Sequence, residues 1–197
     1  MSQPTSTDAD LTRIHTLLPE LDDIADTGLR TTVATIWQEF WRDSQWTDLA
    51  EIAKNPSATQ APERTPDAWT LVTHTRAVAR LAVQAGETMQ ELHGIPFDRD
   101  ALIALALLHD VSKIVEYEGS RQQVRKSQIG ELIQHGVLAA AKMHQHGLPV
   151  EMVHGVVAHT PTSNTFPRTH EALIIRYVDF LDTDVMLLDA GLPLYLS

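Results

Sequence analysis

The sequence predicts an all-α fold, and three observations support this prediction. Apolar residues recur at helical spacing along most of the chain, as at Leu29, Val33 and Ile36. No segment shows the strict alternation of apolar and polar residues that is typical of a half-buried strand. Turn-forming residues fall between the periodic segments, as at Gly147 and Pro149. We therefore expect a bundle of helices.

The N-terminal third is expected to contain a tail, a helical extension and a linker. Residues 1–10 are polar and are interpreted as a disordered tail. Helical patterning begins near Leu11 and continues in pieces to about Lys54. The segment 55–66, NPSATQAPERTP, holds three prolines among small polar residues and is predicted to be a loop or linker. The boundaries that follow are an extension with its linker over residues 11–66 and a second helical domain over 67–197.

Two helices are predicted next, over residues 70–85 and from Asp100 to residue 108. The first has an apolar stripe along one side. Gly94 and Pro96 then indicate a turn, and Asp100 is expected to cap the second helix. The body of that helix is the run ALIALALL, and a helix that is apolar all round is normally buried on every side.

The C-terminal part is expected to contain three more helices. An irregular stretch runs from Asp110 to about Ser127, and a helix is predicted from there over residues 129–144. A second helix covers residues 150–159, and the last long helix covers residues 169–188 after a loop.

Composition limits the class of protein. With 197 residues the chain is long enough for one domain with a substantial core and short for two. The formal net charge of -11 argues against a nucleic-acid polymer as a partner, because the average surface repels phosphate backbones. The absence of cysteine excludes disulfides, thiolate metal sites and a cysteine nucleophile.

The same features indicate a cytoplasmic protein without a membrane partner. Residues 1–10 have no basic or apolar leader, so no signal peptide is expected. The longest apolar run, residues 101–108, is too short to span a bilayer. The oligomeric state is left open, with a homodimer as one option.

Ten histidines are the unusual feature of the composition, and several of them fall on or beside apolar stripes. A single histidine in such a position is often a hydrogen-bonded core residue, and a single aspartate is often a helix cap. The combination is different, because buried polar groups are costly unless paired and a metal ion satisfies several at once. Six residues on five predicted helices meet this description: His74, His109, Asp110, His135, His159 and Asp179. Imidazole and carboxylate ligands suit iron, manganese, zinc or nickel.

This ordered set resembles the HD-domain superfamily of metal-dependent phosphohydrolases, whose pattern is H…HD…H…H…D in a helical core. The matching segments, over about residues 68–188, are THTRAVARLA, ALLHDVSK, LIQHGVLAA, VVAHTP and IIRYVDFLD. The resemblance implies an HD-domain helical bundle, to which residues 11–66 add an N-terminal helical extension with its linker.

The resemblance also implies a ligand set. A first metal ion would be held by His74, His109, Asp110 and Asp179. Asp110 would bridge to a second ion, held by His135 and His159. The implied cofactor is therefore a pair of divalent transition-metal ions, iron or manganese, with zinc, nickel, cobalt or magnesium as alternatives.

The six-residue set is similar to that of several branches of the superfamily. These include diadenosine tetraphosphate hydrolases, cyclic-dinucleotide phosphodiesterases and a small branch of di-iron oxygenases. Thr160 stands where the cyclic-di-GMP enzymes carry a second adjacent histidine, and their GYP signature is absent. The resemblance therefore does not extend to that activity.

Basic residues close to the HD dipeptide are candidates for substrate binding. Lys113 follows Asp110 by three residues, at a position that is often basic in the superfamily and faces the substrate phosphate. A lysine beside a metal centre stabilises phosphoryl charge; a solvated surface lysine is the alternative. Arg121, Arg125 and Lys126 form a small basic cluster nearby, which would bind an anionic substrate or form a solvated loop.

The predicted function is that of a metal-dependent phosphohydrolase acting on a small anionic phosphoester or nucleotide. The metal activates a water, Lys113 stabilises phosphoryl charge, and Asp110 also accepts a proton where bridging leaves it free. One alternative is a di-iron oxygenase that cleaves a C–C or C–P bond with the same ligands. The other is a non-catalytic HD domain that senses a nucleotide.

Overall fold

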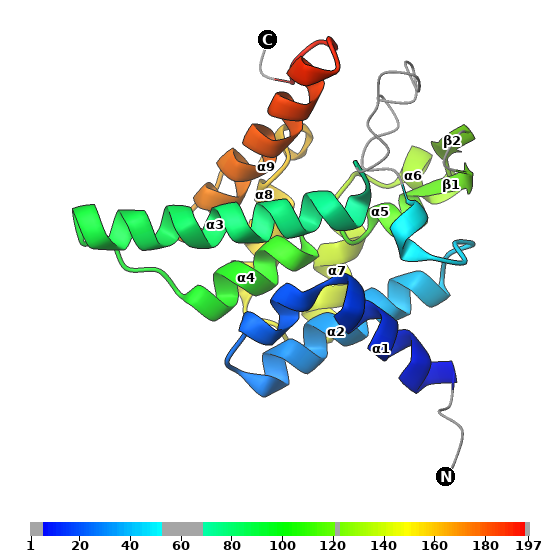
Figure 1. The fold of residues 1–197 in the computed structure, drawn as a ribbon, viewed down its shortest axis with the longest axis horizontal. Coiled ribbons are helices and arrows are strands. Elements are labelled where there is room, and N and C mark those ends of the chain that lie inside the picture. The colour runs from blue at the N-terminus through cyan, green and yellow to red at the C-terminus, as the bar shows by residue number, and fades with distance from the viewer. Residues whose placement is uncertain (1–5, 53–68, 121–122, 196–197) are drawn as a thin grey trace.

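The computed structural model describes residues 6–52, 69–120 and 123–195, and in these ranges the chain is helical apart from one small hairpin (Figure 1). The α-helices are α1 (Ser6–Leu17), α2 (Thr27–Arg42), α3 (Leu71–His93), α4 (Arg99–Leu108), α5 (Lys113–Glu116), α6 (Gln128–Leu132), α7 (Val137–Gln145), α8 (Val150–Ala158) and α9 (His170–Asp189). Three short 3-10 helices are η1 (Pro19–Asp23), η2 (Leu49–Glu51) and η5 (Pro161–Ser163). The strands are β1 (Tyr117–Ser120) and β2 (Gln123–Lys126). The predicted all-α class is confirmed.

Helix α4 lies at the centre of the fold. All residues from Leu102 to Leu108 are buried, as expected for a helix that is apolar on every side. Helices α2, α3, α8 and α9 all pack against it. In Figure 1, α3 runs across the middle of the view, α4 lies below it, α9 rises above it, and α1 and α2 lie at the bottom. The HD dipeptide directly follows this central helix.

The N-terminal helices share one hydrophobic core with the rest of the described chain. Ile14 and Trp37 belong to the same cluster of buried side chains as Leu105 and Ile175. Two indole N–H groups also reach across. Trp37 donates to the carbonyl of Leu107 at 2.8 Å, and Trp46 donates to that of Ile114 at 3.0 Å. The extension therefore supports the backbone on both sides of the HD dipeptide.

Two helix boundaries differ from the prediction, namely the start of α1 and the end of α3. The first helix begins at Ser6, so residues 6–10 are helical where a disordered tail was expected. Helix α3 continues past Ala85 to His93. The helix continues through Gly86. A Cβ at this position would lie 2.9 Å from the ring of Phe97, so there is no space here for a larger side chain. This glycine allows close packing rather than a turn.

Asp100 does not cap α4, contrary to the prediction. Asp98 is the N-cap, and its side chain accepts a hydrogen bond from the amide of Ala101. Asp100 instead accepts from the amides of Ala25 and Asp26, at 3.0 and 2.7 Å. It thereby ties the start of α4 to the start of α2.

The segment between the HD dipeptide and α7 is more structured than expected. It contains α5 and an antiparallel hairpin in which Tyr117 pairs with Lys126 and Glu118 pairs with Arg125. Four-residue strands are too short to show a clear alternation of apolar and polar residues, so no strand was predicted here. The helix expected over residues 129–144 is in fact two helices, α6 and α7.

The remaining expectations have mixed outcomes. Helices α8 and α9 agree with the predicted ranges within one residue at each end. The predicted linker over residues 55–66, and with it the proposed domain boundary, lies outside the described residues. None of the helices in the described parts of the chain combines the length and apolar character needed to cross a membrane.

Candidate metal centre

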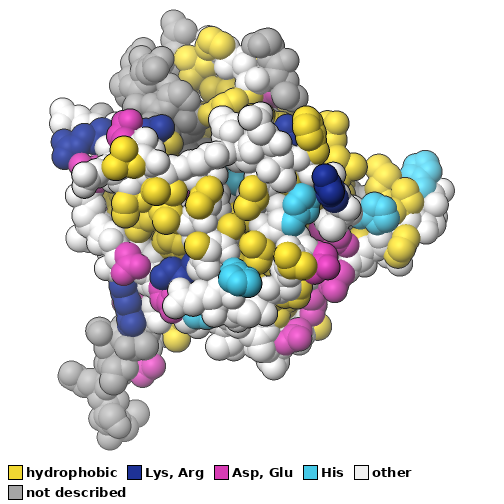
Figure 2. All heavy atoms as spheres, turned by 180° about the vertical axis from the view of Figure 1, so that it is seen from behind, with side chains coloured by type: hydrophobic (Ala, Val, Ile, Leu, Met, Phe, Trp, Pro, Cys, Tyr) yellow, Lys and Arg dark blue, Asp and Glu magenta, His cyan; other side chains and the backbone are white. Residues whose placement is uncertain are grey.

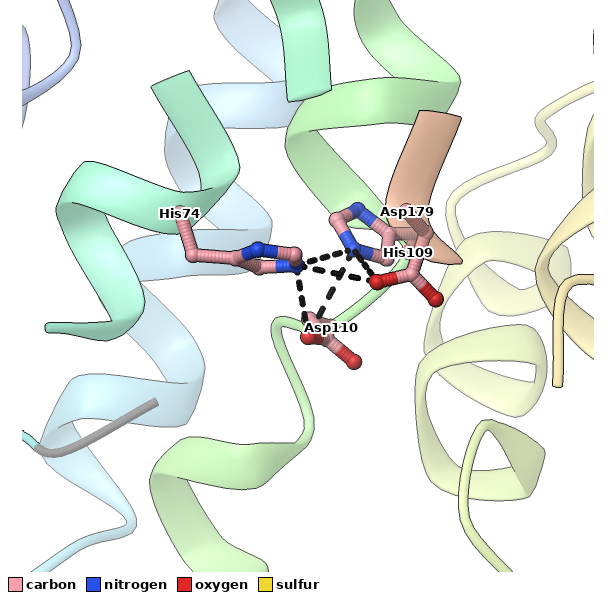
Figure 3. Close-up of side chains that lie close together, drawn as sticks. All are labelled: His74, His109, Asp110 and Asp179. Atoms are coloured by element: carbon pink, nitrogen blue, oxygen red, sulfur yellow. Dashed lines mark hydrogen bonds and ion pairs between the residues drawn. The ribbon is translucent and has the colours of Figure 1, made fainter. Parts of the chain in front are cut away.

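Four of the six predicted ligands converge on one point (Figure 3). His74 comes from α3, His109 and Asp110 follow α4, and Asp179 comes from α9. The Nε2 atom of His74 lies 3.1 Å from Nε2 of His109, 3.3 Å from Oδ2 of Asp110 and 3.2 Å from Oδ1 of Asp179. The three histidine and aspartate segments are thus brought together by the packing of α3 and α9 against α4.

The other two predicted ligands form a second group that shares Asp110. Oδ1 of Asp110 lies 2.9 Å from Nε2 of His135 and 3.7 Å from Nε2 of His159. Its other oxygen, Oδ2, faces His74 and His109. One buried carboxylate therefore presents one oxygen to each group, which is the geometry that a bridging ligand requires.

The ring orientation of two histidines is set by the helices that precede them. Nδ1 of His109 lies 2.6 Å from the carbonyl of Ala106, and Nδ1 of His159 lies 2.6 Å from the carbonyl of Val156. Both carbonyls are in the last turn of a helix, where they lack an intrahelical partner. Each Nδ1 must donate to its carbonyl, which leaves Nε2 as the nitrogen that faces the site.

Carboxylates orient the other two histidines. Nδ1 of His74 lies 2.6 Å from Asp182, and Nδ1 of His135 lies 2.8 Å from Glu116. Sequence reasoning missed both partners. The sequence contains a signal for Asp182: it follows Asp179 by three residues, so the two side chains lie on the same side of α9. Glu116 had none, because it lies in the stretch that was expected to be irregular.

Burial and charge set the protonation of these groups. Burial lowers the pKa of His109 to about 4, which keeps the ring neutral near pH 7. Burial also lowers the pKa of His135, but hydrogen bonds to Asp110 and Glu116 outweigh it and raise the pKa above the usual value. For Glu116, burial raises the pKa, but His135 and Ser112 bring it below its usual range.

The donor set fits a divalent cation. Nε2 of His109 carries a lone pair, because Nδ1 holds the proton for Ala106. That lone pair is directed toward His74 and toward the carboxylates of Asp110 and Asp179 at distances of 3.1–3.8 Å. Lone pairs and anionic oxygens that face one another in a buried site need a cation between them. Imidazole and carboxylate donors suit iron, manganese or zinc.

Lys113 lies where the sequence predicted a cation beside the site. Its Nζ atom is 2.8 Å from Oδ2 of Asp110. Burial lowers the pKa of Lys113, but the carboxylates of Asp110 and Asp179 outweigh this effect and raise the pKa above its usual value. The ammonium is therefore charged beside the site near neutral pH.

A cavity of about 590 Å³ opens onto the two groups. Asp110, His135, His159 and Asp179 form its inner wall, and Lys113 lies among them. Hydroxyl and aromatic side chains also line it, namely Tyr117, Thr160, Thr162, Phe180, Thr183 and Tyr195. This volume is sufficient for a small organic substrate.

Three expectations for individual residues need comment. His135 lies in the turn before α7 and not on a helical stripe, because Ile133 is extended and Gly136 has a φ of 84° that breaks the helix. Arg125 does not line the cavity, because it forms an ion pair with Glu118 at 2.7 Å. Arg121, the third predicted substrate-binding residue, lies outside the described residues.

The helical fold and the cluster of histidines and aspartates around Asp110 are those of a known class of protein. The family model of the HD domain matches residues 71–184, which is more than half of the chain. The chain belongs to the HD domain family. The match begins in α3, with His74, and ends in α9, beyond Asp179 and Asp182.

One relative has an assigned activity. The chain is 30% identical over 116 residues to the dihydroneopterin 2',3'-cyclic phosphate phosphodiesterase of Methanocaldococcus jannaschii. The alignment covers 58% of this chain and 47% of that protein, so the chain spans less than half the length of the relative. No solved structure matches the chain.

Proposed function

We propose that the protein is a metal-dependent phosphohydrolase that acts on a small phosphoester or nucleotide. One observation carries the proposal: five histidine and aspartate side chains converge around Asp110 beside a charged lysine, at the inner end of a cavity. The two groups that share Asp110 support the use of two metal ions, with iron or manganese as the first candidates.

The chain's own residues account for binding and charge stabilisation in this proposal. When bound, the metal lowers the pKa of water and polarises the phosphoryl oxygen. Lys113 supplies a fixed positive charge next to Asp110, where negative charge develops on the phosphoryl group. Glu116 and Asp182 hold the rings of His135 and His74 and so fix the direction of their Nε2 atoms.

The named relative supports a phosphoester as the substrate. By its name, that protein is a phosphodiesterase of a 2',3'-cyclic phosphate, and its alignment covers 58% of this chain. A 2',3'-cyclic phosphate is therefore a reasonable first member of a substrate panel. Other members are phosphomonoesters, nucleotides and dinucleoside polyphosphates.

The test is a hydrolysis assay with this panel under anaerobic conditions, with Mn²⁺ or Fe²⁺ added, in which phosphate release is measured for the monoesters and nucleotides and the ring-opened or cleaved products are separated by chromatography for the other substrates. We expect turnover without oxygen. Lys113→Ala should lower kcat by about 10²–10³, which is the typical loss when one well-placed charge-stabilising group is removed, without lowering metal content. Lys142→Ala is the matched control, since this lysine on α7 pairs with Glu39 and does not line the cavity.

An oxygen electrode distinguishes the oxygenase alternative. Oxygen uptake that depends on substrate, without release of phosphate or opening of a phosphodiester, would overturn the proposal. So would Lys113→Ala and Lys142→Ala variants of equal kcat.

A further inference from the structure

The hairpin β1–β2 presents two different faces, and only one of them belongs to the cavity. Residues directly opposite each other in an antiparallel pair share a face, and successive residues along a strand alternate between faces. Tyr117 is opposite Lys126, and Glu118 is opposite Arg125. Tyr117 and Lys126 line the cavity, whereas Arg125 and Glu118 form an ion pair with each other. The register therefore places Lys126, and not Arg125, on the cavity face.

Lys126 is held in place by the chain on either side. The amide of Ser127 donates to the carbonyl of Glu116 at 2.9 Å, and the Ser127 hydroxyl donates to the carbonyl of Val115 at 2.6 Å. On the opposite strand, the indole N–H of Trp46 donates to the carbonyl of Tyr117 at 3.2 Å. The base of the hairpin is thus anchored to α5, and the cationic side chain extends from a fixed point on the cavity wall.

Lys126 is the lysine of the cavity wall that is not paired with a carboxylate of the described residues. Among the described residues that line the cavity, the cations are Lys113 and Lys126, and the carboxylates are Asp110, Glu116, Glu131 and Asp179. Lys113 is paired with Asp110, but Lys126 has no carboxylate partner in the described parts of the chain. In Figure 2, Lys and Arg side chains gather at the edge of the molecule where the hairpin lies.

Lys113 contacts Asp110 directly, whereas no ion pair joins Lys126 to the candidate metal centre within the described residues. The contacts from Asp110 lead through His135 to Glu116, whose carbonyl accepts a hydrogen bond from the amide of Ser127, the residue after Lys126. Tyr117, which follows Glu116, begins the hairpin wall. A phosphoryl group that reacts at Asp110 would be neutralised by the centre and Lys113. A second cation on the cavity wall matches a second negative group on the same substrate.

We propose that Lys126 binds a second phosphate group of the substrate, with Tyr117 beside it, so that the site selects small molecules that carry two phosphate groups. The inference rests on the proposed phosphohydrolase function for the first of these groups. Lys126 is a specificity-determining residue in this proposal, and it takes no part in the bond-breaking step.

The test compares Lys126→Gln with Arg125→Gln, two neighbours on opposite faces of the same strand. The substrates are a nucleoside 5'-monophosphate and the matching nucleoside 3',5'-bisphosphate. Loss of one charge-assisted contact is expected to raise KM for the bisphosphate about tenfold in Lys126→Gln. The KM for the monophosphate and both kcat values should stay within about twofold of wild type, and Arg125→Gln should match wild type throughout.

A binding measurement separates this inference from the proposed function. Calorimetric titration of the metal-loaded protein with inorganic pyrophosphate and with inorganic phosphate needs no turnover. If the wild type hydrolyses neither substrate but Lys126→Gln weakens pyrophosphate binding alone, the result supports Lys126 as the second phosphate-binding group and counts against hydrolysis of these two substrates. If Lys126→Gln and Arg125→Gln bind pyrophosphate equally, or if Lys126→Gln weakens both anions to the same extent, the inference is wrong.

Discussion

At the scale of single residues, Asp110 has the most demanding position in the molecule. It is buried, and its two oxygens face separate groups of histidines. Such a carboxylate in a low-dielectric site requires positive charge close by, and Lys113 supplies only one contact. The histidines around it are each oriented by an acceptor on Nδ1, so their Nε2 atoms have little freedom to turn away.

Replacement of Asp110 should therefore remove both metal ions and the stability that they add. We expect Asp110→Ala to bind far less metal than wild type and to show almost no rise in Tm when Mn²⁺ is added, because a ligand that binds only the folded state stabilises it by mass action. Elemental analysis and thermal unfolding with and without Mn²⁺ measure the two effects. Asp189→Ala, at the exposed end of α9, is the control. A fully metallated Asp110→Ala protein would contradict the assignment.

A second residue-scale prediction concerns the number of ions. His135→Ala combined with His159→Ala removes two of the three members of the second group and leaves the first group intact. The metal content per chain should fall from about two ions to about one, because a single ion needs about four ligands and the first group provides them. Elemental analysis of protein purified without chelator gives the result. An unchanged metal content would show that the second site does not exist.

At the scale of secondary-structure elements, helix ends do much of the positioning. The histidines at 109 and 159 follow directly after α4 and α8, and the unpaired carbonyls of those helices hold their rings. The start of α4 is fixed in a different way. Asp98 caps the helix by accepting a hydrogen bond from the amide of Ala101, and Asp100 accepts hydrogen bonds from two amides at the start of α2. These contacts set the direction of the central helix, and so the place at which the HD dipeptide emerges.

Asp100→Ala tests this tie between elements. It removes two hydrogen bonds to a carboxylate at a half-exposed position, so we expect a loss of about 1–2 kcal/mol in the free energy of unfolding at pH 7. Urea denaturation measures it. The amides of Ala25 and Asp26 lower the pKa of Asp100 below its ordinary 3.8. The stabilisation is thus fully present above pH 3.8 and is lost as the pH falls through the lowered pKa.

The pH dependence provides an internal control for that prediction. The difference in stability between wild type and Asp100→Ala should shrink at acid pH, whereas a difference that stays constant from pH 7 to below 3.8 would mean that the carboxylate charge is not involved. Asp189→Ala is again a suitable comparison, because Asp189 lies at an exposed position near the end of α9.

At the scale of the whole molecule, the N-terminal layer and the HD-matching part share one core. The family match begins at residue 71, yet Trp37 is completely buried against the helix that leads to His109. Trp46 similarly holds the backbone around Lys113 and the hairpin. We infer that the extension acts as a structural support for the site rather than as a separate functional module.

Trp37 provides the test of that support. Trp37→Ala should lower the free energy of unfolding by about 3–5 kcal/mol, as large core truncations do. Trp37→Phe keeps most of the apolar volume and loses the N–H that reaches Leu107, so its cost should be smaller, about 1–3 kcal/mol. Because His109 lies two residues after Leu107, Trp37→Phe should also weaken metal binding, measured by titration with Mn²⁺. Metal affinity equal to wild type would show that the contact supports stability alone.

Much of the fold and of the candidate site could be predicted from the sequence. The apolar run from Leu102 to Leu108 can be stable only when buried, and the prediction of a central helix followed from that. The ordered histidines and aspartates indicated one site, and the structure brings all six together. The prediction of the buried helix was confirmed because its hydrophobic pattern is present in the sequence itself, whereas the role of the six side chains as metal ligands stays a prediction.

Other features depended on contacts between distant segments, which leave no local pattern. Gly86 and Gly136 are the same type of residue but have different roles. Gly86 lies inside a helix against Phe97, whereas Gly136 ends a turn with a positive φ. The roles of Asp98 and Asp100 were exchanged, because both can cap a helix and only the approach of α2 decides which one does. Glu116, the orienting partner of His135, lay in a segment with no periodicity at all.

The sequence by itself determined the all-α class, the buried central helix and the identity of the six converging side chains, because hydrophobic periodicity and the spacing of polar residues are local properties of the chain. Only the tertiary structure decided that one carboxylate faces two histidine groups, that Trp37 and Trp46 hold the backbone around the site, and that Lys126 rather than Arg125 faces the cavity. The physical reason is that each of these depends on strand register or on the packing of helices far apart in the chain, and such long-range contacts are selected by the free energy of the whole fold.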